Sequence, residues 1–239
     1  NSAQFLNRSA ASLAMSVFQR RLTSSTWALL KSFERRQKKL DGLIEDILSG
    51  KITESDLDSG QRKLASGLPD PIDAKTADEE EGEENERIED RALGGVVAVN
   101  LAELRSERAQ VTTLLELARE VHEAGDESKF EKLRELIKDS RFKDEKILIF
   151  TEHRDTLDFL VGKLESIGFG GKIAQIHGSM PYGEEANVER LTERQDNVEF
   201  FRLPDEQGGA TYMVCTDAAA EGINLQFCWL MVNYDIPWN

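Results

Sequence analysis

Small and polar residues suited to phosphate or ribose recognition follow three apolar runs of the sequence. Thr151 ends the first run, Gly178 ends the second, and Thr216 ends the third, which Asp217 to Asn224 follow. Glycine lets a ligand approach the backbone, and threonine and asparagine side chains form hydrogen bonds with phosphate and sugar oxygens. Taken singly, each residue fits a plain strand-to-helix turn equally well, with Thr216 or Asp217 capping the next helix.

Four apolar runs predict the strands that position these residues. They are KILIFT (146–151), KIAQIHG (172–178), ATYMVCT (210–216) and WLMVNYDI (229–236). Helical patterns lie between them, one with Leu157, Leu160 and Leu164 at spacings of three and four, another from Glu184 to Arg194. Alternating strands and helices predict parallel βαβ units, whose ligands bind beyond the carboxyl ends of the strands. We expect an α/β fold with a parallel sheet flanked by helices.

The residues before this segment predict an α-helical region. A first helix over 24–48 carries an apolar stripe of Trp27, Leu30, Phe33, Leu40, Leu43, Ile44 and Ile47. Ser24, Ser25 or Thr26 is a candidate cap, and Gly50 a candidate stop. Its other faces are expected to carry a basic group of Lys31, Arg35, Arg36, Lys38 and Lys39.

A second pair of helices, separated by Gly125, is predicted before the first strand. The stripe of the first of them is Leu101, Leu104, Val111, Leu114, Leu115, Ala118 and Val121, and that of the second is Phe130, Leu133, Leu136 and Ile137. The expected organisation is therefore a helical region at 1–67, an acidic flexible linker at 68–95, a helical pair at 96–144 and an α/β lobe at 145–239.

Charge is distributed unevenly along the chain. The net charge is −15, and residues 78–90 hold nine acidic side chains and one basic one. Residues 145–239 carry 16 acidic and 7 basic side chains, which argues against tight autonomous binding of nucleic acid, because such affinity comes mainly from phosphate neutralisation. The basic group around Arg35 is a candidate nucleic-acid contact, a solvated helix face or a partner for the acidic tract.

Composition excludes several classes of protein. No apolar run approaches the roughly 18 residues that a membrane-spanning helix needs, and the first residues lack a secretory signal, so we expect a cytoplasmic protein without a membrane partner. Cys215 and Cys228 form no CxxC pair and have no neighbouring histidine. Neither a zinc site nor a disulfide is expected, and no metal-ligand set is predicted.

The order of these segments resembles a known family. ILIFTEHRDTLDFL is similar to motif IV of superfamily-two helicases, IHGSM to the block that follows it, and VCTDAAAEGINLQ with MVNYDIPWN to motif V and its trailing strand. The resemblance covers residues 145–239 and favours the Swi/Snf-type helicase-like ATPases, in particular their bacterial RapA/HepA-like branch. QRRLTSSTWALLKSFERR (19–36) resembles the helical stretch that often precedes the second lobe in that branch.

The resemblance implies the second of two RecA-like lobes that clamp ATP with Mg²⁺ between them and step along double-stranded DNA. The first lobe of the same protein would be its partner and would bind most of the nucleotide. Carried over by motif, the nucleic-acid contacts are Thr151, Gly178 and Thr216, and the nucleotide-binding residues of motif V are Asp217, Glu221, Gly222 and Asn224.

Two departures imply that the chain alone is catalytically inactive. No segment matches GxxxxGK[ST], so the loop that cradles phosphates is absent, and Asp126 to Lys129 imitates a DExx box without the buried strand before it. The arginine-rich block of the family would begin just past Asn239, and an arginine finger contributes about 10³ to 10⁵ in rate. No catalytic residue is assigned. The alternative interpretation is a non-catalytic RecA-like module that docks a protein through its helices.

Overall fold

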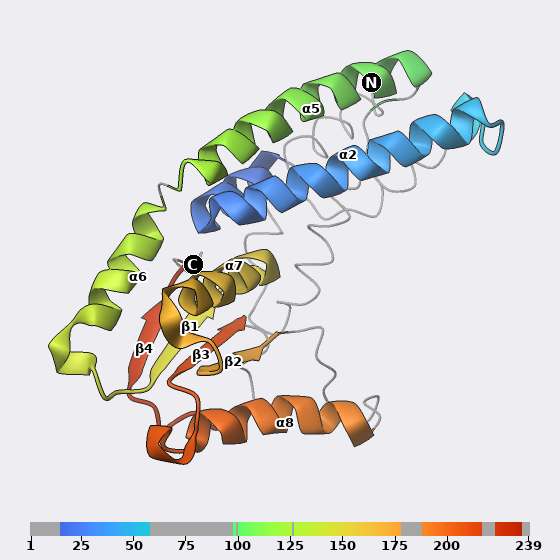
Figure 1. Ribbon diagram of the computed structural model, residues 1–239. Coiled ribbons are helices and arrows are strands. Elements are labelled where there is room, and N and C mark those ends of the chain that lie inside the picture. The colour runs from blue at the N-terminus through green and yellow to red at the C-terminus, as the bar shows by residue number, and fades with distance from the viewer. Residues whose placement is uncertain are drawn as a thin grey trace. The chain divides into compact units, whose positions relative to one another are not determined.

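The structure, a computed structural model, describes residues 15–57, 98, 100–125, 127–177, 188–216 and 223–235, with the backbone alone for 188–193 (Figure 1). The chain divides into two compact units, Asn1–Asp126 together with Asn239, and Glu127–Trp238. We call them the helical unit and the sheet unit. None of the helices described is long and apolar enough to cross a membrane.

The helical unit contains a helix over 15–24, then α2 (Thr26–Leu48) and α5 (Leu101–Glu123). Ser25 separates the first two because its backbone is extended and its Oγ accepts a hydrogen bond from the N–H of Ala28 at 3.0 Å, which caps α2. The predicted cap is therefore confirmed. The chain leaves α2 through Ser49 and Gly50, whose φ of +73° suits glycine.

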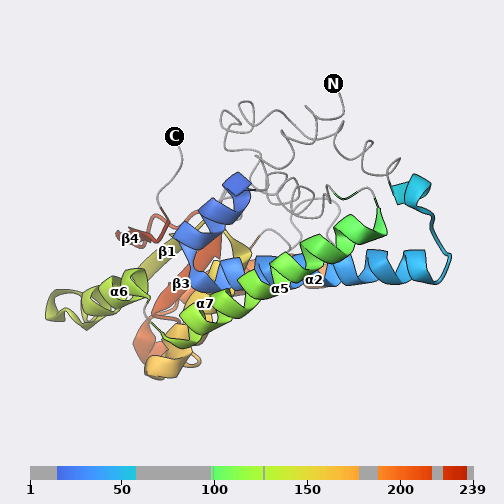
Figure 2. The same cartoon turned by 90° about the horizontal axis from the view of Figure 1, so that it is seen from above.

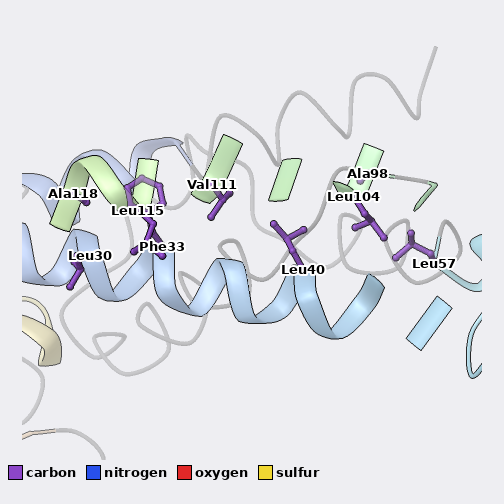
Figure 3. Close-up of a cluster of buried hydrophobic side chains, with 9 residues drawn as sticks. All are labelled: Leu30, Phe33, Leu40, Leu57, Ala98, Leu104, Val111, Leu115 and Ala118. Carbon is purple, nitrogen blue, oxygen red and sulfur yellow. The ribbon is translucent and has the colours of Figure 1, made fainter. Parts of the chain in front are cut away.

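A continuous apolar core joins α2 and α5, which lie side by side in both views (Figures 1 and 2). Figure 3 shows the buried side chains of this core, which are Leu30, Phe33, Leu40, Leu57, Ala98, Leu104, Val111, Leu115 and Ala118. The stripe predicted for α5 was too wide, because Leu114 and Val121 are 45% and 46% exposed. Only the positions that face α2 are covered.

Arg36 does not lie on the exposed basic face that the sequence predicted. Its side chain is buried, and its Nε donates a hydrogen bond to Glu107 Oε1 of α5 at 2.9 Å. The reason is helical spacing, since Arg36 follows Phe33 by three residues and precedes Leu40 by four, which places it on the buried face. Arg35, Lys38 and Lys39 are exposed as expected.

The sheet unit begins with α6 (Ser128–Lys138) and the short helix η3 (Ser140–Phe142), and then alternates strands and helices. The elements are β1 (Ile147–Thr151), α7 (Arg154–Leu164), η4 (Glu165–Phe169), β2 (Ile173–Ile176), α8 (Val188–Arg202), η5 (Asp205–Gln207), β3 (Tyr212–Thr216) and β4 (Leu230–Asn233). All strand pairs are parallel, and the order across the sheet is β2-β3-β1-β4. The predicted parallel sheet is confirmed.

Helices cover both faces of this sheet, with α7 and α8 on opposite sides in Figure 1. On one face Leu148 and Met213 pack with Phe201 of α8. Leu157 and Leu160 of α7 are also fully buried. Strands buried on both faces read as continuous apolar runs, which is why the sequence revealed them. The arrangement is that of an α/β RecA-like lobe with flanking helices.

Two details refine the predicted elements. Helix α8 extends to Arg202 and not to Arg194, because Phe201 at its end is fully buried under the sheet. Residues 184–187 of the predicted helix lie outside the described residues. Strand β4 lies at one edge of the described sheet, where Trp229 and Met231 are 65% and 59% exposed.

Candidate functional site

The carboxyl ends of the four strands meet at one edge of the sheet. Thr151 ends β1 and Thr216 ends β3, and the two are direct partners in the parallel register. His177 follows β2, and Asp235 comes two residues after β4. Because all four strands are parallel, these polar residues share the edge at which parallel sheets bind ligands. The structure therefore brings two of the predicted nucleic-acid contacts, Thr151 and Thr216, together.

These strand-end residues are buried despite their polarity. Thr151, Thr216, His153 and His177 are all below 10% exposed. A buried polar side chain costs free energy unless it is hydrogen-bonded, so such a group of side chains needs a network of partners. The partners of Thr151 are defined most completely.

Asp235 is the acceptor that organises the exit of β1. The Thr151 hydroxyl donates to Asp235 Oδ2 at 2.6 Å, and the backbone N–H of Glu152 donates to the same oxygen at 2.9 Å. The Lys129 ammonium of α6 donates to the other oxygen, Oδ1, at 2.7 Å. One carboxylate thus joins three segments that are far apart in the sequence. We call Asp235, Lys129, Thr151 and Glu152 the Asp235 network.

The surroundings of Asp235 stabilise its ionised form. Burial alone raises the pKa of this carboxyl group, but the hydrogen bonds and charge of Lys129, together with the hydroxyl of Thr151, outweigh burial and hold the pKa below its usual value. Asp235 is therefore a carboxylate at neutral pH. Its negative charge is balanced directly by the Lys129 ammonium.

Tyr234 packs against this network and is hydrogen-bonded to β1. Its backbone N–H donates to the carbonyl oxygen of Phe150 at 2.8 Å, and the Lys129 ammonium lies 4.4 Å from the centre of its ring. Burial raises the pKa of the Tyr234 phenol, as do the negative charges of Glu127 and Asp235. Tyr234 is therefore a neutral phenol at any physiological pH.

The other predicted site residues are placed only in part. Asn224 is exposed, and its Oδ1 accepts a hydrogen bond from the backbone N–H of Gln226 at 3.2 Å, which shapes a local turn. Gly178, Asp217, Glu221 and Gly222 lie outside the described residues. Within the ranges that the structure describes, no group of histidine, cysteine and acidic side chains could hold a metal ion.

Sequence reasoning missed Asp235 and Lys129. An acidic residue near the end of the fourth predicted run was a usable signal for Asp235, since every strand exit of a parallel sheet lies at the same edge. No local pattern points to Lys129, because it is separated from Asp235 by 106 residues and sits on a helix before the strands begin.

Comparisons with known proteins agree with this geometry. The family described as the helicase conserved C-terminal domain matches residues 128–239. The uncharacterized ATP-dependent helicase YqhH of Bacillus subtilis is 35% identical over 96 residues, which cover 40% of this chain and 14% of that protein. The ATP-dependent RNA helicase fal1 of Schizosaccharomyces pombe is 33% identical over 92 residues, covering 38% of this chain and 20% of that protein. The search of solved structures found no match.

The matches concern the sheet unit and a small part of each relative. The chain spans 14% and 20% of the lengths of these two helicases. The matched family region begins at the first residue of α6, so α6 falls within it together with the sheet. Residues 128–239 are therefore similar to the conserved C-terminal domain of helicases.

Proposed function

We propose that this chain supplies the second lobe of a Swi/Snf-type, ATP-dependent DNA translocase of the RapA/HepA-like branch. In this proposal two RecA-like lobes close on ATP and advance along nucleic acid, and the second lobe alone does not hydrolyse ATP. The observation that carries the proposal is the edge of buried polar residues at the exits of four parallel strands, with Thr151 and Thr216 paired across β1 and β3. The helicase match to residues 128–239 supports it.

We assign the residues of this edge two roles. Thr151, Gly178 and Thr216 contact the nucleic-acid backbone, and the motif V residues Asp217, Glu221, Gly222 and Asn224 meet the nucleotide. The buried Thr151 hydroxyl donates to Asp235, so we assign the nucleic-acid contact at this position to the backbone of the strand exit, which this bond shapes. The first lobe, a partner in the same protein, holds most of the ATP and its Mg²⁺, because no segment of this sequence matches the phosphate-binding motif GxxxxGK[ST].

Double-stranded DNA is the proposed substrate, on the strength of the motif resemblance. The name of the fal1 relatives specifies RNA, which makes RNA the competing substrate for this chain. A protein that reads phosphates binds both polymers, and RNA is distinguished by its 2′-hydroxyl groups and groove shape. The two substrates therefore have to be compared directly.

The decisive experiment is steady-state ATP hydrolysis by this chain and by the longer protein that joins it to a first lobe. Each is measured alone, with duplex DNA and with RNA of the same sequence. We expect no turnover from the chain, and turnover by the longer protein that duplex DNA stimulates. Stimulation by RNA alone would replace DNA as the substrate. Absence of turnover under every condition would exclude the motor.

Gly222 offers a point test of the same proposal. In the longer protein we expect Gly222→Val to abolish ATP turnover, because a β-branched side chain would crowd the nucleotide edge of motif V. The thermal unfolding temperature should stay at its wild-type value, because the proposed role of this residue is to meet the nucleotide. Wild-type turnover in Gly222→Val would refute the assignment of motif V.

A second candidate function is a non-catalytic docking module, and one observation favours it. Leu114, Leu117 and Val121 of α5 lie at spacings of three and four and are 45%, 55% and 46% exposed. An exposed apolar stripe of this kind is typical of protein interfaces. The hydrolysis assay separates the two functions, because a docking module gives no turnover in any protein that contains it.

A further inference from the structure

The chain enters the sheet unit beside the strand exits. The unit begins at Glu127, and α6 begins at Ser128. Its second residue, Lys129, already reaches Asp235 at the end of β4. The first turn of α6 is therefore attached to the ligand edge of the sheet, although α6 is not part of the strand-helix alternation.

The contacts of Asp235 are divided between two sides. Oδ1 accepts from Lys129 of α6, whereas Oδ2 accepts from Thr151 and from the backbone N–H of Glu152, both at the exit of β1. Asp235 itself lies two residues after the end of β4. A movement of α6 would consequently displace the Asp235 carboxylate, which fixes the backbone between β1 and α7.

Only the carboxylate of this ion pair is buried, since the Lys129 side chain is 37% exposed. The Asp235 side chain is 9% exposed, whereas both partners of the Arg202–Glu199 pair on α8 are over 40% exposed. Exposed pairs contribute little to stability, but a buried carboxylate that loses its cation is left with an uncompensated charge. Lys129 also lies over the Tyr234 ring, so its ammonium is held from two directions.

We propose that Lys129 is a positioning residue. Through Asp235 it connects the first turn of α6 to the exits of β1 and β4, and it thereby fixes the backbone at the carboxyl ends of the strands, where ligands bind. The link to ligand binding rests on the proposed function. The link between α6 and the strand exits rests on the contacts of the Asp235 network alone.

The first test uses the 239-residue chain and the variant Lys129→Met, which keeps an unbranched apolar side chain one heavy atom shorter and removes the charge. Hydrogen exchange at the Glu152 amide should accelerate at least about fivefold, because the local opening that exposes this amide becomes easier. The carboxyl carbon of Asp235, followed by NMR, should titrate at higher pH than in the wild type. Lys129→Arg should restore both values in large part.

Lys132→Met is the matched control, because Lys132 is exposed on the same helix. It should leave both values at the wild-type level. The inference is overturned if Lys129→Met leaves Glu152 exchange and the Asp235 titration unchanged. It is also overturned if Lys132→Met has the same effect, since the change would then reflect general weakening of α6.

The second test measures ATP hydrolysis by the longer protein. Lys129→Met should lower kcat about tenfold or more at unchanged KM for ATP, since small misplacements of reacting groups have large effects on rate, and Lys129→Arg should recover it. If the decrease in kcat of Lys129→Met only matches the decrease in the fraction of folded protein, the link between Lys129 and the ligand-binding strand ends is overturned. A wild-type protein without turnover would remove the proposed function, whereas exchange and titration would still decide whether Lys129 positions the strand exits.

Discussion

Asp235 shows how much one side chain determines at the strand exits. It accepts hydrogen bonds from Lys129, Thr151 and Glu152, and these bonds favour its charged form. A group whose pKa is lower in the folded than in the unfolded state stabilises the fold wherever it is ionised in both states. Protonating Asp235 removes that contribution.

We therefore expect Asp235 to make stability depend on pH in the acid range. Its contribution is fully present above the unfolded pKa of about 4 and is lost as pH falls through the lower folded pKa. The measurement is the free energy of unfolding by urea from pH 7 downward, for the wild type and for Asp235→Asn. The difference between the two should be largest at neutral pH and shrink below pH 4. A difference that does not vary with pH would contradict this role.

Gly209 tests a close approach between backbone segments. A Cβ atom at this position would lie 1.9 Å from the carbonyl oxygen of Leu203, which is far inside van der Waals contact. Gly209→Ala should destabilise the chain by about 1 to 3 kcal/mol, as overpacking does. The control is Gly162→Ala in α7, where a Cβ meets nothing within 4 Å and should add up to about 1 kcal/mol of stability. Thermal or urea unfolding distinguishes them, and equal effects would contradict the proposed clash.

Part of the candidate site could be predicted from the sequence. The rest depends on contacts between segments that are far apart in the sequence, which local patterns do not reveal. Thr151 and Thr216 were identified because polar residues after apolar runs mark strand exits. Arg36 was placed wrongly, because a charge was taken as a sign of exposure while its spacing from Phe33 and Leu40 placed it inside. The bond between Lys129 and Asp235 depends on tertiary structure, which local patterns do not contain.

At the scale of elements, α2 and α5 depend on each other for burial. Each has one apolar face, and most of the helical core lies between these faces (Figure 3). Helices of this kind owe their stability mainly to packing and less to intrinsic propensity. A cavity at the shared face should therefore affect both helices.

Leu40 is fully buried in this core, and Leu40→Ala should cost about 2 to 5 kcal/mol through lost burial and the cavity left behind. Leu48→Ala at the exposed end of the same helix should cost far less, because this side chain is 62% exposed. Circular dichroism during urea unfolding gives both values. If Leu40→Ala and Leu48→Ala lowered the free energy of unfolding by similar amounts, packing of the apolar face of α2 against α5 would not be what stabilises α2.

The elements themselves were largely readable from the sequence. All four strands were predicted because strands buried on both faces are apolar throughout, and Ser25 was among the predicted caps. The end of α8 was missed because its later apolar residues, Val198 and Phe201, are packed under the sheet only in the folded chain. The width of the α5 stripe was overestimated, because periodicity marks which residues share a face but not whether anything covers it.

At the scale of the whole molecule, net charge opposes contact with nucleic acid. The chain carries −15 overall, with nine acidic side chains in residues 78–90. Long-range repulsion of this kind lowers the affinity for phosphate polymers and depends on salt. A chain with this charge is expected to bind nucleic acid weakly on its own.

We expect the chain alone to bind duplex DNA with a Kd above about 10⁻⁶ M at physiological salt, no tighter than ordinary non-specific binding. Replacing the nine acidic side chains of residues 78–90 by their amides should strengthen binding, most clearly at low salt. Fluorescence anisotropy at several salt concentrations measures this. Nanomolar binding by the wild type, or no response to the amide substitutions, would contradict the electrostatic argument.

The edge strand β4 has a consequence for how the purified chain behaves. It lies at the end of the described sheet and displays Trp229 and Met231 to solvent. An open strand with apolar side chains is a template on which a second polypeptide can add a strand, and this is a common route to aggregation. Concentrated samples should therefore aggregate through strand pairing at β4. The substitution Met231→Lys should slow this aggregation, because it places a charge on the edge strand.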